Sequence, residues 1–347
     1  MATTPVKSGA VTLLDVAQAT DPNGKIPAVA ELLSQSNEIL LDMPWYEGNL
    51  ATGHKGVIRT GLPEGTWRKL YAGIPAGKSL RATVEDAVGM LEARAEVDKD
   101  VVELNGNTSA YRLSEAQAFL EGMNQSFAQA LVYGNAGLNP EQFNGLDIRY
   151  KALSGTVGQN VISAGGSQSD NTSVWLIVWG QNTVHGIYPK GSKAGLSHDD
   201  LGLIDAFDGN QNRYRAYADH WQWKCGIHVK DWRYVVRIPN IDVSDLAAIT
   251  GTQATTAATF LPRLMIKALA RIPHMGMGKA CFYANRTVKE MLSIQAMEKS
   301  QSVLSLQAGV REFGNVSPGS VSAGNLSLLG VPVRTVDRIL ESEAVIS

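Results

Sequence analysis

Apolar residues recur at helical spacing along residues 114–134, the clearest periodic pattern in the chain. Steps of three and four residues connect Ala116, Phe119, Leu120, Met123, Phe127, Ala130 and Leu131. Ser114 and Gln117 have the spacing of a capping box, and Gly134-Asn135 is a stop signal. The pattern predicts an amphipathic helix over 114–134, about 30 Å long, whose apolar stripe packs into a core.

The second half of the chain mixes strand and helix patterns in an order that predicts an α+β fold. Apolar runs or alternation predict strands in "SVWLIVWG" (173–180), "VHGIYP" (184–189), "KDWRYVVRI" (230–238), "KACFYAN" (279–285) and "SLLGVPVRTVDRI" (327–339). In 230–238 the alternation predicts a half-buried strand, with Arg237 on the polar face. Helical spacing predicts helices over 255–272, with Pro262 in the first turns, and over 286–299. No fixed-period repeat is present, which excludes solenoids and propellers.

The first 90 residues lack a core pattern of their own. Two short amphipathic runs before residue 43 are broken by Pro22-Asn23-Gly24, and they predict an arm that needs a partner surface. Residues 44–90 are extended in character, with a turn expected at 62–65 between two strand-like runs and a second turn expected at 75–77. An isolated two-stranded hairpin is marginal in water. We therefore expect this segment to lie against other parts of the chain or against a neighbouring copy.

Charge is segregated along this region. Between Lys55 and Arg81 there are six basic residues and one acidic residue, whereas between Glu85 and Glu103 there are seven acidic and two basic residues. Such runs are usually solvated faces. The alternative is that the basic loop of one copy meets an acidic surface of the next and fixes its register. On this hypothesis the intersubunit contact residues are Lys55, Arg59, Trp67, Arg68, Lys69, Lys78, Arg81, Glu92, Glu96 and Asp98.

Composition narrows the class of protein. The chain has 347 residues, 44% of them hydrophobic, and a net charge of −2, which gives a sizeable core but no overall basic footprint for gripping nucleic acid. Cys225 and Cys281 form no spaced framework, which indicates a reducing compartment. We see no signal peptide and no membrane-length apolar run. The expectation is a soluble protein made in the cytosol.

The sharpest enzyme-like pattern is "GIPAGKS" (73–79), which ends like a phosphate-binding loop. Only three residues separate its glycines, and Pro75 removes a backbone donor from the cradle. A Gly/Pro turn between extended stretches is the better interpretation. A nucleotide-binding enzyme that uses this loop stays as a weak alternative.

Other candidate chemistry is weaker still. His220, Cys225 and His228 are zinc-ligand types, but strand alternation turns Cys225 away from both histidines. Asp199-Asp200 follows His198 in a polar stretch, without a sign of acid–base tuning. We assign no catalytic, cofactor-binding or metal residues and expect no cofactor.

Five segments carry a resemblance to a known family: "LPEGTWRKLYAGI" (62–74), "GMLEARAEVDKDVVELNGN" (89–107), "SEAQAFLEGMNQSFAQALVYGN" (114–135), "WGQNTVHGIYPKGSKAGL" (179–196) and "LLGVPVRTVDRI" (328–339). In their order and in their residues they resemble the major capsid proteins of tailed bacteriophages, which share the Hong Kong 97 fold, and are most similar to the short-tailed group that includes epsilon-fifteen. The resemblance spans nearly the whole chain, and none of these segments is catalytic.

The resemblance implies a division of the chain into capsid parts. These are an N-terminal arm (1–45), an extended loop hairpin (46–91), a peripheral domain (92–238) with the long spine helix 114–134, an axial domain (239–325) and a C-terminal return strand to the peripheral domain (326–347). Some relatives of the fold form a Lys–Asn crosslink between subunits. Lys69 and Lys78 are available here, but no matching Asn or assisting Glu is identified, so this chemistry is not carried over.

The resemblance also implies a function and partners. The chain would be a structural protein and not an enzyme, a subunit that self-assembles through hexamers and pentamers into an icosahedral head around double-stranded DNA. Portal and scaffold or decoration proteins would be further partners, the DNA would be contacted weakly, and no membrane would be involved. The protein would reside in the virion after assembly in the bacterial host cytoplasm. An encapsulin-like compartment of the same fold is the alternative.

Overall fold

The computed structural model describes residues 37–103, 108–208, 210–248, 260–298, 304–307 and 325–347. The predicted N-terminal arm lies outside the described residues up to residue 36. The chain divides into two compact units. Unit 1 contains Met90–Phe127 and Gly195–Lys224, and unit 2 contains the described parts of Ser36–Gly89, Ala128–Ala194 and Cys225–Ser347. Each unit is described by itself.

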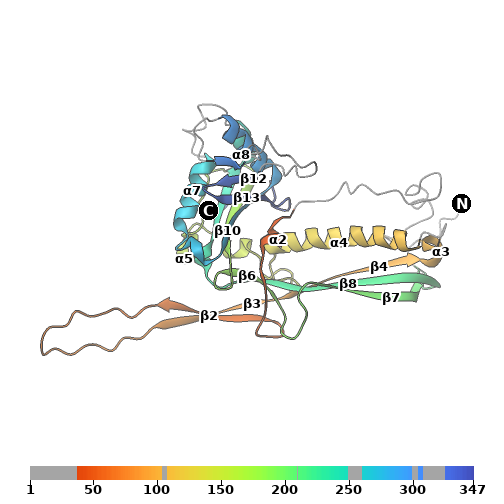
Figure 1. Cartoon of the computed structure of the whole chain (residues 1–347), viewed down its shortest axis with the longest axis horizontal. Helices are drawn as coiled ribbons and strands as arrows, with labels where there is room; N and C mark the ends of the chain where they lie inside the picture. The colour runs from red at the N-terminus through yellow and green to blue at the C-terminus, as the bar shows by residue number, and fades with distance from the viewer. Residues whose placement is uncertain (1–36, 104–107, 209, 249–259, 299–303, 308–324) are drawn as a thin grey trace, which may run out of the picture. The chain divides into compact units, whose positions relative to one another are not determined.

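Unit 2 is built on a mixed sheet. Its strands are β1 (Trp45–Glu47), β5 (Asn171–Trp179), β6 (Val184–Tyr188), the end of β8 (Arg213–Val229), β9 (Val235–Asp242), β10 (Lys279–Ala284), β11 (Leu304–Gln307), β12 (Asn325–Leu328) and β13 (Val331–Thr335). The central strand β5 pairs antiparallel with β9 and β10. β13 lies parallel to β10 (Figure 1). Strands predicted at 173–180, 184–189 and 279–285 are confirmed as β5, β6 and β10.

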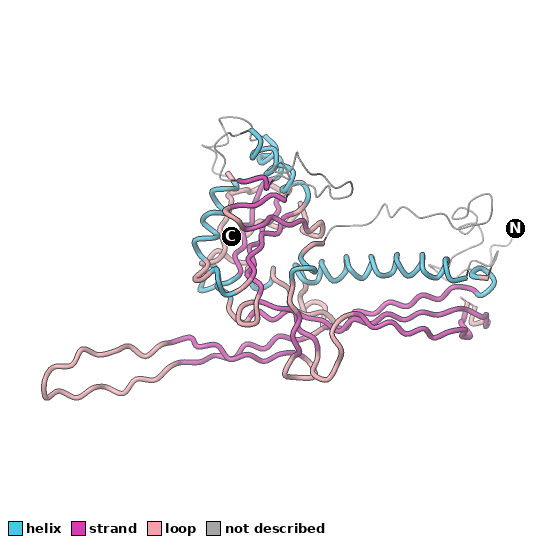
Figure 2. Tube along the Cα trace, viewed as in Figure 1, coloured by secondary structure: helices cyan, strands magenta, loops and turns pink. Residues whose placement is uncertain are grey.

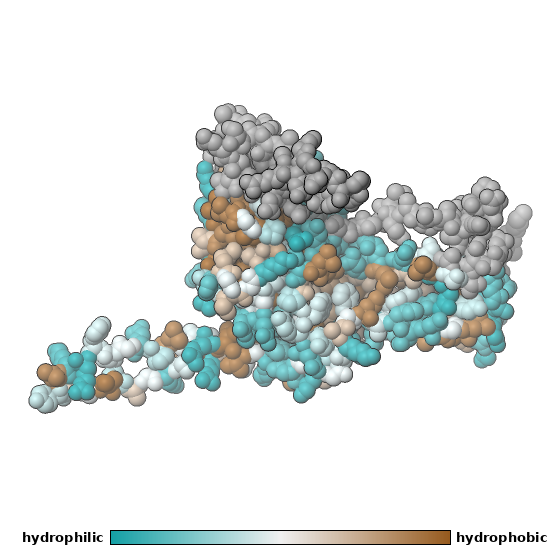
Figure 3. Space-filling view, in the orientation of Figure 1, coloured by the Kyte–Doolittle hydropathy of each residue, from teal (hydrophilic) through white to brown (hydrophobic). Residues whose placement is uncertain are grey.

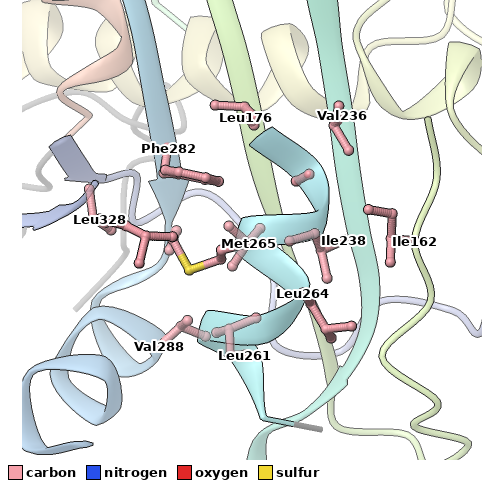
Figure 4. Packing of buried hydrophobic residues seen from close by; sticks show 14 of the residues in the cluster. Ile162, Leu176, Val236, Ile238, Leu261, Leu264, Met265, Phe282, Val288 and Leu328 are labelled. Carbon is pink, nitrogen blue, oxygen red and sulfur yellow. The ribbon is translucent and has the colours of Figure 1, made fainter. Parts of the chain in front are cut away.

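Helices cover a face of this sheet and form the main core. α7 (Leu261–Arg271) begins with Pro262 in its first turn, and α8 (Arg286–Glu298) follows β10. Figure 4 shows Met265 of α7 pointing among apolar side chains from the strands and from α8. β5 is buried at every position, as a central strand covered on both faces must be. The remaining short helices of unit 2 are α2 (Ile39–Asp42), η2 (Asp147–Arg149), α5 (Gly155–Gly158), η3 (Trp232–Tyr234), α6 (Val243–Ala248) and η5 (Met275–Met277).

Two strand predictions in unit 2 are wrong in detail. Residues 232–234 form the short helix η3, because the Asp231 carboxylate accepts a hydrogen bond from the backbone N–H of Arg233 and starts a turn. β9 then begins at Val235 and is buried at all positions, including Arg237. The predicted single strand over 327–339 is instead a tight hairpin of β12 and β13, because Leu329 and Gly330 both adopt positive φ and reverse the chain.

Unit 1 consists of strands packed on a long helix. β4 (Gly89–Asp98) and β7 (Leu196–Phe207) flank β8. The short helix α3 (Lys99–Val102) follows β4, and the long helix is α4 (Thr108–Tyr133). Ala95, Met123 and Trp221 form one buried cluster, with Phe119 stacked on Trp221.

A charged group on α4 ties the helix to these strands. Arg112 donates to Asp219 and to Asp200, each at 2.7 Å, and these carboxylates raise the pKa of the guanidinium.

The long helix begins earlier than predicted. α4 starts at Thr108, so Ser114 lies within the helix and does not cap it. Good helix formers such as Ala110, Arg112 and Leu113 precede Ser114 without a Gly or Pro, so nothing stops the helix from extending upstream. The predicted end is confirmed, since the last helical residue is Tyr133 and Gly134 follows.

Candidate assembly interface

The extended segment of unit 2 forms a two-stranded ribbon that continues into a long exposed loop. β2 (Gly53–Gly61) pairs antiparallel with β3 (Leu80–Ala87), with a register shift between Arg59 and Gly61. Figure 2 shows the strands ending and the loop 62–79 continuing beyond them. We call residues 62–79 the tip. The tip contains no strand, so the strand-like run expected after the turn at 62–65 is wrong.

The tip exposes large apolar side chains. Every tip residue is exposed except Ser79, which is half-buried. Trp67 is 100% exposed and Leu70 is 87% exposed, and Leu62, Tyr71 and Ile74 are exposed as well. Figure 3 shows hydrophobic surface beside hydrophilic surface along this loop. Sequence reasoning identified Trp67 alone. The other apolar side chains were missed because they do not recur with one clean period that would mark an exposed face.

A tight turn lies at the centre of the tip. The Ala72 amide donates to the Lys69 carbonyl at 3.2 Å, and Tyr71 adopts a positive φ of 67°. A positive φ is uncommon for a residue other than glycine. The turn leaves the Leu70 and Tyr71 side chains in solvent.

The basic candidates lie along this ribbon and its tip. Lys55 on β2 pairs with Glu85 of β3 at 3.6 Å. Arg68 makes only a long local contact, from Nε to the Lys69 carbonyl oxygen at 3.4 Å. No ion pair with a described residue is present for Arg59, Arg68, Lys69, Lys78 or Arg81.

The acidic candidates all have partners within unit 1. Glu92 accepts from Gln222 and contacts His220 at 3.3 Å, and the hydrogen bond from Gln222, followed by that from His220, lowers the pKa of Glu92.

Glu96 pairs with Arg94 at 3.1 Å. Asp98 caps α3 by accepting from the Asp100 amide at 2.9 Å. The structure therefore does not bring the acidic and basic candidates together within one unit.

The enzyme-like candidates take structural places. Residues 73–79 lie in the exposed tip and lead into strand β3, not into a helix whose N-terminus could face a phosphate. Asp200 is an ion-pair partner of Arg112, and the pKa of Asp200 is lowered by that bond. Burial raises the pKa of the Cys225 thiol.

The described part of the chain offers neither a metal site nor a membrane-spanning helix. Over the described residues, no group of three or more His, Cys, Asp and Glu side chains is arranged to hold a metal ion. Within the same ranges, no helix combines the length and apolar character needed to cross a membrane.

Comparison with known proteins finds a matching family model and a similar solved structure. A family model described as Major capsid protein GP7 matches residues 21–347. A near-atomic cryo-EM structure of bacteriophage Epsilon15 contains a chain that is 32% identical, with a TM-score of 0.73 and 97% of each chain covered. A search of curated proteins gave no match.

Two other solved structures are much less similar. A bacteriophage JBD30 capsid chain is 8% identical, with a TM-score of 0.46, 76% of this chain and 84% of that chain covered. An encapsulin from Synechococcus elongatus is 10% identical, with a TM-score of 0.41, 67% of this chain and 96% of that chain covered. The capsid reading is favoured over the encapsulin alternative by the family model that matches residues 21–347 and by the 32% identical Epsilon15 chain.

These findings define a structural protein of the Hong Kong 97-like class, the class that builds icosahedral phage heads. The chain belongs to the Major capsid protein GP7 family. It is therefore the self-assembling subunit of a phage head shell and is found in the virion.

Proposed function

We propose that the tip, residues 62–79, is the surface by which one copy of this capsid subunit holds a neighbouring copy. The observation that carries the proposal is its set of large apolar side chains with no cover from the described chain. Large apolar side chains exposed together on one loop are typical of interaction sites. Trp67 is the proposed anchor, because aromatic side chains are enriched at the energetic centres of interfaces.

The basic tip also sets the register of that contact. Glu92, Glu96 and Asp98 already have partners inside unit 1. Arg68 of a neighbouring copy would therefore share a carboxylate with that existing partner. Exposed pairs of this kind contribute only about 0–1 kcal/mol each. The apolar anchor then supplies most of the affinity, and the charges orient the contact.

The proposal extends to the wider assembly. Residues 1–45 act as an arm, 46–91 as the extended loop, 92–238 as the peripheral domain, 239–325 as the axial domain and 326–347 as the return strand. Subunits assemble in the host cytoplasm into hexamers and pentamers, with portal and scaffold or decoration proteins as partners. The net charge of −2 suits a wall that contacts packaged double-stranded DNA weakly. The role is structural and not enzymatic.

The test combines electron microscopy with one substitution. Purified wild-type protein should form closed shells under assembly conditions. Trp67→Ala should fold normally but assemble poorly, because each lost anchor costs about 2 kcal/mol or more per contact. The assembled fraction is measured by sedimentation at a series of protein concentrations.

The matched control is Leu138→Ala, which truncates another exposed apolar side chain of unit 2 outside the ribbon. It should assemble like the wild type. Normal shells from Trp67→Ala at every concentration would remove the tip from the interface and leave the capsid function intact. Failure of the wild-type protein to form any shell would instead count against the capsid function.

A further inference from the structure

Three histidines gather where the β2–β3 ribbon meets the rest of unit 2. In the register of the ribbon His54 lies opposite Asp86, and in the neighbouring pair of strands His185 of β6 lies opposite His228 of β8. The ring centroids are 4.5 Å apart for His54 and His228, 5.2 Å for His185 and His228, and 6.0 Å for His54 and His185. We call these three residues the histidine cluster. Half of the six histidines of the chain therefore lie within contact of one another.

The rings are packed without enough hydrogen-bond partners. His228 is fully buried and His185 is 3% exposed. Over the described residues, His54 Nδ1, His185 Nδ1 and His228 Nε2 are buried and lack a hydrogen-bond partner. Gly56 of β2 permits the close approach, since a Cβ at that position would lie 2.9 Å from His228 Nε2. The ribbon thus packs directly against the His228 ring, whose Nε2 has no hydrogen-bond partner among the described residues.

Among the described residues, few charged groups surround the cluster, and Asp86 is the negative one. Asp86 of β3 accepts from His228 Nδ1 at 2.7 Å and from Arg149 at 2.6 Å. Lys230 adds a second positive charge within electrostatic range of His54 and His185. The ring of Tyr46 on β1 meets His185 edge-on at 5.0 Å. Asp86 is already shared between Arg149 and His228, so among the described groups no further negative charge is available to balance protons on His54 and His185.

We propose that the histidine cluster is an acid-sensitive latch that holds the root of the ribbon, residues 53–61 and 80–88, against β6 and β8. With His54 and His185 neutral, the root packs closely. Added protons place like charges on facing strands at a buried site, where like-charged pairs are destabilising. The root then separates from β6 and β8 while the core around α7 stays folded, and the tip loses its fixed base.

The pH range follows from the direction of the shifts. Burial, together with the positive potential of His228, lowers the pKa of His54, and the same two causes lower the pKa of His185 to about 4. An exposed histidine has a pKa near 6.5. The opened form therefore takes up protons first, so the latch is closed above about pH 6.5 and opens progressively as the pH falls toward about 4. Asp86 keeps its charge through this range, because its pKa is also lowered: burial acts to raise it, but the bonds from His228 and Arg149 outweigh burial.

Hydrogen exchange of the full-length protein tests the latch. Exchange is compared at pH 7.5 and 5.0 after correction for the intrinsic effect of pH. Protection at 53–61 and 80–88 should fall at least about tenfold at pH 5.0, and protection of α7 and β10 should stay unchanged. In His54→Phe, which keeps an aromatic ring but cannot take a proton, most of the fall should disappear.

The control is His274→Phe, the same change at an exposed histidine outside the histidine cluster, which should respond to acid like the wild type. If His54→Phe does not fold at pH 7.5, His54→Gln carries the same expectation. Protection at the root that is indifferent to pH overturns the latch. So does a fall that is equal in His54→Phe, or one that spreads through α7 and β10 together.

Discussion

Arg237 is a buried cation held by an unusually complete set of partners. Its side chain is 1% exposed and stacks 4.8 Å from the Trp175 ring. Its polar contacts are Asp147 at 2.6 Å, Glu343 at 2.9 Å, Ser173 Oγ at 3.1 Å and the Tyr150 carbonyl at 3.1 Å. Because Glu343 belongs to the C-terminal segment, this one residue anchors the end of the described chain to the central sheet of unit 2.

Removing the Arg237 guanidinium should be strongly destabilising. Arg237→Met keeps much of the side-chain volume but leaves the Glu343 carboxylate buried without its cation, and breaking a buried pair in this way costs about 3–5 kcal/mol. The free energy of unfolding of the unassembled chain, measured by urea titration, should fall by that amount. Glu343→Gln in the same background should restore part of the loss.

Arg233→Met is the matched control on the same segment. Arg233 pairs with Asp231 at 2.7 Å, but its side chain is 54% exposed. Exposed pairs contribute about 0–1 kcal/mol. Equal losses from Arg233→Met and Arg237→Met would contradict the role given to burial.

At the scale of elements, the sequence predicted the helix end and the buried strands that depend on nearby residues. It missed the burial and the contacts that depend on segments far apart in the chain. The end of α4 at Gly134 and the buried strands β5 and β10 follow from nearby residues alone. The alternation in 230–238 suggested a half-buried strand, but other parts of unit 2 cover its polar face and bury Arg237. The charge segregation along the ribbon was visible, yet the intrachain partners of Glu92 and Glu96 were not. The histidine cluster was missed because residues 54, 185 and 228 become neighbours only when β6 pairs with β8 and the β2–β3 ribbon packs against them.

Two glycines of the α4 region should respond oppositely to alanine. Gly122 is exposed within the helix, and a Cβ there would have no atom within 4 Å, so Gly122→Ala should stabilise the chain by about 0.5–1 kcal/mol. At Gly134 a Cβ would lie 2.4 Å from the Ala130 carbonyl oxygen and 2.5 Å from that of Phe143. Gly134→Ala should therefore destabilise by about 1–3 kcal/mol, as overpacking does. Thermal unfolding of the unassembled chain measures both, and the same sign for the two substitutions would contradict the packing at the end of α4.

At the scale of the whole molecule, the proposed role of the tip assigns stability and assembly to different residues. Within the described parts of the chain, the buried clusters of each unit contain no tip residue, so the packing of these cores does not depend on the tip. The tip instead presents apolar and basic side chains to solvent. In a shell each subunit repeats such contacts many times, so weak individual contacts add up to a firm assembly. Substitutions in the tip should therefore alter shell formation and leave the unfolding of the single chain unchanged.

Charge reversal at Arg68 tests two points: that the tip acts in assembly and not in folding, and that the basic tip meets an acidic segment of the neighbour. Arg68→Glu places a negative charge on the basic tip, and if the tip meets a neighbour's acidic segment, repulsion should lower the assembled fraction at low salt. The deficit should shrink in high salt, because exposed charges are screened. Glu96→Arg in the same chain should restore part of the assembly, although it also loses the Glu96 contact with Arg94. Lys151→Glu, the same charge change at an exposed lysine outside the ribbon, is the control. Light scattering during assembly is measured for the wild type, for Arg68→Glu, for Arg68→Glu with Glu96→Arg, and for Lys151→Glu. An Arg68→Glu variant that assembles like the wild type at both salt concentrations would show that charge on the tip does not contribute to the contact with the neighbour.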